Sequence, residues 1–240
     1  MTILERSSLP PNDVNVIRLL FVCSALLATS ALAQPAPPDA PDTLVGRVEG
    51  KSYVSPTGAF RVEIPVLPEL GGRIVDTENV VTFQDDFNVL CTIAAFPMDA
   101  SLRWELSTRG RKDFLAYFFA NYVMPDFQHS FRGAKAESAK YAPGIADGSL
   151  LVYLLLPGGS MFSHKLSFTG PDDKIPDAKR GNLLLIRDGW TFVLSIELAE
   201  RILERSTYDK TTAQEDEILR ERLIDLMHKI EFATPPSPAK

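Results

Sequence analysis

Apolar and polar residues alternate along several short segments in the first half of the chain. Residues 60–64 switch between apolar and charged side chains, which predicts a strand with one buried face that ends at Pro65. Further strands are predicted over 73–83 and 87–96. The polar stretch 84–86 lies between them, so we expect these two strands to form a hairpin.

A helical period replaces the alternation over residues 108–123. Its apolar stripe consists of Phe114, Leu115, Phe118, Phe119 and Tyr122. We expect this helix to pack on a sheet and to end at Pro125, with Tyr117 on its exposed side. Aromatic residues at helical spacing belong more often to a core than to a ligand pocket, and we interpret the stripe as core.

Strand patterns return in the second half of the chain. They cover residues 129–141, 149–156, 161–168 and 182–187. The segment 149–156 is apolar without alternation, which predicts a strand buried on both faces. Asp188-Gly189 stands between 183–187 and 190–196 and predicts a hairpin with a type I′ turn.

The last predicted element is a C-terminal amphipathic helix. Thr212 and Glu215 have the spacing of a capping box at its start. Its apolar stripe consists of Leu219, Leu223, Leu226, Met227 and Ile230. A shorter amphipathic piece over 198–205 is expected before it, with Glu197 and Arg201, four residues apart, on a solvated face.

This order of elements predicts an α+β fold, in which an antiparallel sheet of six to eight strands is flanked by helices. The composition agrees with one globular domain, since 45% of the 240 residues are hydrophobic and 23% are charged. The formal net charge of −6 argues against a nucleic-acid groove or a polybasic membrane-binding surface.

The stretch from Tyr53 to Pro65 resembles the opening of PsbP-like domains, with a polar turn that contains Gly58 followed by an aromatic-led strand that ends in Pro. The hairpin 183–196 followed by the helix 215–230 is similar to their closing element. The resemblance implies a six- or seven-stranded antiparallel sheet flanked by helices. The family contains extrinsic photosystem proteins, a nuclear import factor and bacterial envelope proteins without assigned activity, and it implies no catalytic residues here.

The N-terminus has the features of an export signal. Arg18 precedes the apolar run 19–28, and the segment Ala31-Leu32-Ala33 supplies the small residues that a signal peptidase reads. We predict cleavage between Ala33 and Gln34 and a periplasmic or secreted location. The apolar run is too short for a stable membrane anchor.

These signals divide the chain into four parts. We expect a signal peptide over 1–33, a Pro-rich linker over 34–43, a single α+β domain over 44–232 and a disordered Pro-rich tail over 233–240. After cleavage Cys91 is the remaining cysteine, so no disulfide within one chain is expected.

The candidates for chemistry are scattered. Cys91 lies on the apolar face of strand 87–96 and is interpreted as a buried free thiol. The three histidines, His129, His164 and His228, have no metal-ligand spacing. We therefore assign no catalytic, cofactor-binding or metal-binding residue, and we expect no cofactor.

Other polar clusters have ordinary explanations. Residues 158–160, Asp85-Asp86 and Asp172-Asp173 are typical of turns. The basic residues Arg103, Arg109, Arg111 and Lys112 form a cluster before the aromatic helix. The cluster could meet an acidic partner or phosphate, but a solvated helix edge is the favoured interpretation. Trp104, nearby, is expected to be partly buried.

Three hypotheses about function remain open. A non-catalytic envelope binding or accessory module, using a groove between sheet and helix, is favoured because no constellation supports turnover. The alternatives are a hydrolase or transferase with a site assembled from distant loops, and an envelope interaction or assembly component that uses a strand edge or the aromatic helix. The expected partner is an envelope protein or a small ligand, with no nucleic acid.

Overall fold

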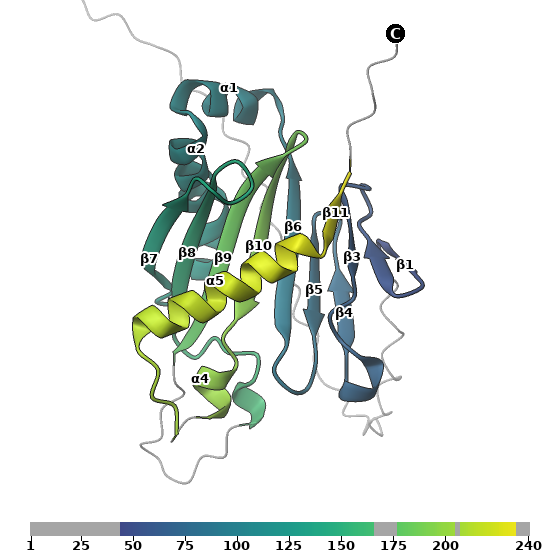
Figure 1. Ribbon diagram of the computed structural model, residues 1–240, viewed down its shortest axis with the longest axis vertical. Coiled ribbons are helices and arrows are strands. Elements are labelled where there is room, and N and C mark those ends of the chain that lie inside the picture. The colour runs from purple at the N-terminus through teal and green to yellow at the C-terminus, as the bar shows by residue number, and fades with distance from the viewer. Residues whose placement is uncertain (1–43, 166–176, 205–206, 234–240) are drawn as a thin grey trace, which may run out of the picture. The chain divides into compact units, whose positions relative to one another are not determined.

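The computed structural model describes residues 44–165, 177–204 and 207–233 (Figure 1). The predicted signal peptide and linker lie outside these residues, as do Asp172-Asp173 and the end of the tail. Within the described chain, no helix is both long and apolar enough to cross a bilayer.

A seven-stranded antiparallel sheet forms the centre of the fold, with strand order β4-β5-β6-β10-β9-β8-β7 (Figure 1). Its strands are β4 (Arg73–Asp76), β5 (Val80–Gln84), β6 (Leu90–Pro97), β7 (Lys135–Ala142), β8 (Ser149–Leu156), β9 (Ala178–Arg187) and β10 (Trp190–Glu197). A second antiparallel sheet has the order β1-β2-β3-β11. It is built from β1 (Arg47–Glu49), β2 (Ser52–Val54), β3 (Phe60–Glu63) and β11 (Ile230–Phe232).

The two faces of the large sheet are covered by different elements. Helix α5 (Thr212–His228) and the small sheet pack on one face, where Phe83, Leu183 and Leu219 share a core. Gly181 lies under α5, and a Cβ atom there would be 3.0 Å from the Cβ atom of Leu219. The absence of a side chain at Gly181 therefore allows the helix to approach β9 closely.

The opposite face is covered by helices from the segment between β6 and β7. These are α1 (Ala100–Arg109), α2 (Arg111–Phe118), the π-helical turn η2 (Phe119–Val123) and α3 (Met124–Ser130). Phe114, Phe118 and Leu154 are among the residues of this second core. The remaining short helices are η1 (Pro68–Leu70), η3 (Ser163–Lys165) and α4 (Glu200–Leu203).

This architecture confirms the predicted α+β class, with an antiparallel sheet flanked by helices and a C-terminal helix. Strand β8 has the predicted bounds and is almost entirely buried. Asp188 and Gly189 have φ angles of 51° and 80°, as the predicted type I′ turn requires. The predicted strand 60–64 is β3 of the small sheet, but the other strands of that sheet were not predicted, because strands of three residues leave little periodic signal.

Several predicted bounds are wrong. The segment 73–83 is a hairpin of β4 and β5, because residues 77–79 turn the chain. Residues 129–134 precede β7, and residues 161–165 form turns and η3 in place of a strand.

The helical segment also differs from the prediction. Helix α1 was missed, and Pro125 does not end the helical run, because it occupies the first turn of α3, where a missing N–H is tolerated. Trp104 is 62% exposed and Tyr122 is 46% exposed, whereas both were expected to be at least partly buried.

Candidate functional site

Lys179 and Arg180 place two cations at the start of β9, one on each face of the large sheet. Successive side chains of a strand point in opposite directions. Lys179 accordingly contacts α5, whereas Arg180 lies against the rings of Phe127 and Phe131 at the end of α3. Each of the two residues lies at the centre of a separate cluster of polar side chains.

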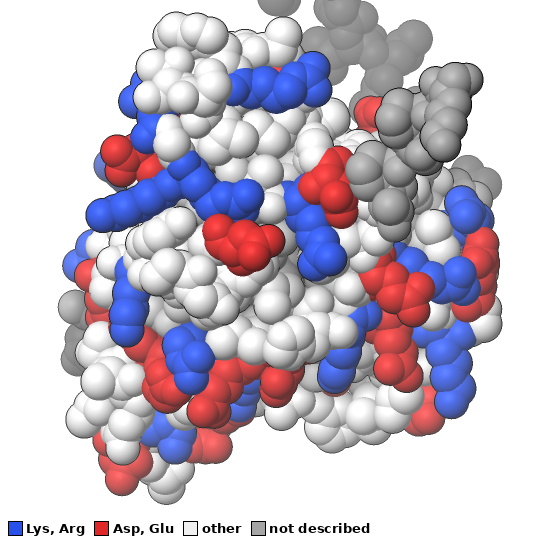
Figure 2. Space-filling view, turned by 45° about the horizontal axis from the view of Figure 1, so that its top comes forward, with Lys and Arg blue, Asp and Glu red and all other residues white. Residues whose placement is uncertain are grey.

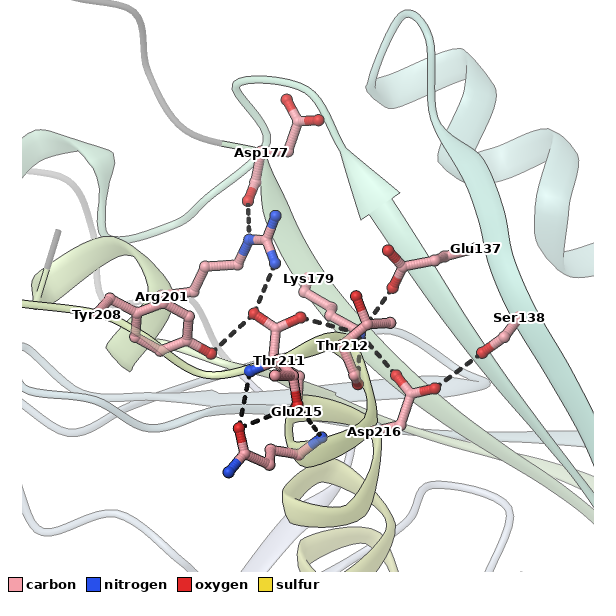
Figure 3. A network of polar contacts seen from close by, with 11 residues as sticks. Glu137, Ser138, Asp177, Lys179, Arg201, Tyr208, Thr211, Thr212, Glu215 and Asp216 are labelled. Carbon is pink, nitrogen blue, oxygen red and sulfur yellow. Dashed lines mark hydrogen bonds and ion pairs between the residues drawn. The ribbon is translucent and has the colours of Figure 1, made fainter.

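The Lys179 network comprises Glu137, Lys179, Arg201, Tyr208, Glu215 and Asp216 (Figure 3). Its centre, Lys179, is fully buried, and its Nζ atom lies 2.6 Å from Glu137, 3.0 Å from Glu215 and 2.6 Å from Asp216. These carboxylates come from β7 and α5, so the lysine ties both elements to β9.

Glu215 is the most connected carboxylate of the network. Arg201 lies 2.6 Å from its Oε1 atom, and the Tyr208 hydroxyl donates to the same atom over 2.8 Å. Burial alone would raise the pKa of Glu215, but hydrogen bonds from Tyr208, Lys179 and Arg201 outweigh it and hold the pKa below its usual value. Burial and the hydrogen bond to Glu215 together raise the pKa of Tyr208.

The position of Glu215 corrects the predicted capping box. The residues that cap α5 are Thr211 and Gln214, one position earlier than expected. Glu215 instead faces inward and pairs with Lys179. None of the network residues lines the cavities of about 300, 340, 370 and 480 Å³ found in the described part of the chain. The network is a packed contact between β7, β9 and α5 whose centre is buried.

On the other face, Arg180 pairs with Glu197 across the strands β9 and β10. Its Nη2 atom donates to Glu197 Oε2 over 3.2 Å, and the Glu197 side chain is fully buried. The Ser160 hydroxyl donates to the second oxygen of Glu197 over 2.5 Å, and the backbone N–H of Met161 reaches Oε2 over 3.4 Å. Glu197 therefore fixes the loop after β8 against the sheet.

The guanidinium of Arg180 is incompletely paired. Its Nε atom is buried and has no hydrogen-bond partner among the described residues. An unsatisfied buried donor costs about 1–3 kcal/mol, and more when it is charged. Burial lowers the pKa of Arg180, although pairing with Glu197 partly offsets this effect.

A row of hydroxyl and amide groups continues from this pair across the same sheet face. Ser195 donates to the buried Asn182 over 2.5 Å, and the Asn182 amide donates to the backbone carbonyl of Val152 over 3.3 Å. Further along, Thr82 and Thr92 share a hydrogen bond of 3.2 Å. The sheet face under α3 is thus polar at a place where the rest of the face is apolar.

A cavity of about 340 Å³ opens over this polar area, between α3 and the sheet. We call it the α3 groove. Leu90, Phe127, Phe131 and Met161 supply its apolar walls, and Thr82, Thr92 and Ser130 supply hydroxyls. Arg180 and Asp126 are the charged residues among those that line it.

The α3 groove offers a guanidinium, a carboxylate from Asp126 and three hydroxyls as its polar groups. Arginine stays protonated in proteins, so Arg180 cannot exchange a proton with a substrate. The hydroxyls of Thr82 and Thr92 bond to each other, without a histidine beside them in the described chain. The arrangement suits a small ligand with apolar parts and a hydrogen-bonding group.

The residues that the sequence singled out are not brought together. Cys91 is buried in β6 on the α5 face, as predicted, and burial raises its pKa to about 12. It borders a separate cavity of about 370 Å³ beside α5. His129 and His228 are exposed in the last turns of α3 and α5. Among the described residues, no three His, Cys, Asp or Glu side chains form a metal-ligand group.

The important charged residues were missed or misinterpreted in the sequence. Glu197 and Arg201 were expected to share a solvated helix face, but Glu197 ends β10 and pairs with Arg180, while Arg201 pairs with Glu215. Ser160 was interpreted as turn chemistry alone, although its hydroxyl bonds Glu197. A useful signal was the Lys179-Arg180 pair directly before the apolar run of β9, because cations at the start of a buried strand need partners.

Comparison with known proteins gives matches in structure only. No protein-family model matches the chain, and neither does any curated protein sequence. Among solved structures, the chain is similar to PsbP (CyanoP) from Synechocystis sp. PCC 6803, with 14% identity and a TM-score of 0.43, over 79% of this chain and 99% of that one.

Another similar structure is the Saccharomyces cerevisiae Ran-binding protein Mog1p, with 10% identity and a TM-score of 0.42, over 77% of this chain and 95% of that one. A point mutant of the protein Mog1 gives 9% identity and the same TM-score, over 78% of this chain and 97% of that one. The chain is similar to these structures at low identity and low TM-score, and the similarity says nothing about function.

Proposed function

We propose that this chain is an exported, non-catalytic binding module of the cell envelope, and that it holds a small ligand in the α3 groove. The observation that carries the proposal is the groove itself, with apolar walls, a hydroxyl-bearing floor and Arg180 in its lining. This combination is typical of sites that bind and orient a small molecule.

The distribution of charged groups supports binding over turnover. An enzyme would gather titratable groups with displaced pKa values in a cleft. Here Lys179, Tyr208 and Glu215 have displaced pKa values, but they pack against one another away from the α3 groove. Their arrangement serves to hold α5 on the sheet. The pKa of Arg180, in the groove lining, is also lowered, but an arginine stays protonated and does not exchange protons with a substrate.

Export is proposed from the sequence features of residues 18–33, with release of the chain into the periplasm or medium. The proposed partner is a small ligand or an envelope protein and not nucleic acid. On the face seen in Figure 2, Lys and Arg side chains alternate with Asp and Glu and form no continuous basic surface. The net charge of −6 supports the same proposal.

Native mass spectrometry of protein purified from an envelope fraction tests the binding function. We expect a small-molecule adduct on the wild-type protein and its loss in a Ser130→Phe variant, because Ser130 lines the groove from an exposed position on α3. Gln128→Phe is the matched control, since Gln128 is exposed on the same helix and does not line the groove. An adduct that persists in Ser130→Phe would contradict the proposed site.

A second candidate function is assembly with an acidic envelope protein through α1 and η2. Trp104 and Tyr122 are largely exposed there, and the Arg109 guanidinium lies 4.4 Å from the ring centroid of Tyr117. Arg103 on α1 and Lys112 on α2 are also exposed. Aromatic and arginine side chains are enriched at the centres of protein interfaces.

Gel filtration in envelope extract tests this candidate. We expect the wild-type protein to elute in a larger complex than a Trp104→Ala variant, and we expect high salt to weaken that complex. Equal elution of the two proteins would remove the assembly hypothesis without affecting the α3 groove.

A further inference from the structure

Arg180 has donor groups that its partner Glu197 does not use. Glu197 Oε2 accepts from Nη2 of Arg180, and its Oε1 is occupied by the Ser160 hydroxyl. The buried Nε atom of Arg180 has no partner among the described residues. That Nε atom is buried and is not accessible from the groove, but a guanidinium offers five N–H donors, so Arg180, which lines the groove, keeps donors besides Nε and the one given to Glu197.

The surroundings of Arg180 would strengthen a charged hydrogen bond. The rings of Phe127 and Phe131 lie 5.9 and 5.7 Å from the guanidinium carbon, and the arginine side chain is 12% exposed. In such a setting water competes poorly, and hydrogen bonds between a guanidinium and a carboxylate are among the strongest available. The same rings offer an apolar surface for the body of a ligand.

The charges and the volume of the α3 groove restrict the class of ligand further. Asp126 lines the groove from an exposed position, and Glu197 is paired with Arg180, so a negative charge of the ligand beyond the one that contacts Arg180 would be repelled. A cationic group placed next to Arg180 would be repelled by its charge. The volume of about 340 Å³ is near the lower end of the range for small-molecule sites.

From these observations we infer that the α3 groove binds a small monocarboxylate with an apolar body, whose carboxylate accepts hydrogen bonds from Arg180 and whose body rests on Phe127 and Phe131. This inference rests on the proposed binding function and adds the chemical class of the ligand. The Thr82 and Thr92 hydroxyls lie in the same lining and can accept or donate to further polar atoms of the ligand.

The test compares two probes of nearly equal shape, phenylacetate and phenylacetamide, in amide-proton NMR titrations of the purified protein. Phenylacetate should shift resonances of α3 and of the first residues of β9. The uncharged amide should bind about tenfold or more weakly, because it lacks the charge that Arg180 recognises. Ser130→Phe should abolish the shifts, and Gln128→Phe should preserve them.

A variant at Arg180 separates recognition from folding. Arg180→Gln alone would leave Glu197 buried without a cationic partner and could unfold the protein. The double variant Arg180→Gln with Glu197→Gln removes both charges, so a folded protein is expected. It should bind the acid and the amide equally and weakly.

The outcomes distinguish the ligand class from the proposed function. Equal binding of both probes to the wild-type protein, lost in Ser130→Phe, would overturn the monocarboxylate inference and leave the binding function standing. Phenylacetate shifts that persist in Ser130→Phe, or an absence of shifts with either probe at millimolar concentration, would also overturn it. The binding function would then be judged by the mass-spectrometric adduct alone.

Discussion

Lys179 and Arg180 are adjacent in β9, yet their charged groups lie on opposite faces of the seven-stranded sheet and pair with different elements. Lys179 contacts carboxylates of β7 and α5, and Arg180 contacts Glu197 and the aromatic rings at the end of α3. Residues 179 and 180 of β9 therefore contact the elements that pack on both faces of the sheet. The Lys179 side is closed and structural, whereas the Arg180 side borders a groove.

Replacement of Lys179 tests the structural role of the closed side. Lys179→Met would leave Glu137, Glu215 and Asp216 without their shared cation, and we expect it to lower the free energy of unfolding by about 3–5 kcal/mol. Urea denaturation measures the loss. Lys140→Met is the control, because Lys140 is exposed on strand β7 of the same sheet and should change stability little. A loss equal to that of the control would show that the network does not stabilise the fold.

Glu215 makes this stability depend on pH. Its pKa in the folded protein lies below the usual value of 4.5, so its ionised form stabilises the fold at neutral pH. That contribution is fully present above the unfolded pKa and is lost as the pH falls through the folded pKa. We expect unfolding free energy measured between neutral and acid pH to decline below about 4.5. In Glu215→Gln the decline should be shallower, and an unchanged slope would contradict the assignment.

The sequence predicted the elements whose signals are local. The run of β8 and the Asp188-Gly189 turn were correct, because a continuous apolar stretch and a pair of residues that tolerate positive φ each have one favourable structure. The buried position of Cys91 followed from strand alternation in the same way. Such features depend on neighbours within a few residues.

The candidate site could not be predicted because its parts come from distant segments. Arg180 meets Glu197 across a strand pair, and Ser160 reaches the same carboxylate from a separate loop. In the sequence, Glu197 and Arg201 have the spacing of an exposed helical ion pair. The structure separates them, because β10 continues through Glu197 before α4 begins at Glu200. The cavity itself has no sequence signal.

Cys91 should be chemically inert in the folded protein. It is 4% exposed, and burial raises its pKa to about 12, so both access and thiolate formation are disfavoured. We expect iodoacetamide to modify Cys91 slowly under native conditions and completely in urea, as measured by peptide mass spectrometry. A Cys91→Ser, Ala213→Cys variant should react rapidly, because Ala213 is exposed in the first turn of α5. Rapid native modification of Cys91 would restore the hypothesis of a reactive thiol.

The last prediction tests export of the protein, and it concerns residues outside the described chain. If a signal peptidase reads the small residues at positions 31 and 33, the protein recovered from an envelope fraction should begin at Gln34. Ala33→Leu should block cleavage, because a bulky residue does not fit the peptidase, and a precursor that retains residues 1–33 should accumulate. Ala28→Leu is the control, since it keeps the apolar run and lies before the cleavage region. N-terminal sequencing and immunoblotting of fractionated cells measure both outcomes, and an unprocessed wild-type chain in the cytosol would exclude export.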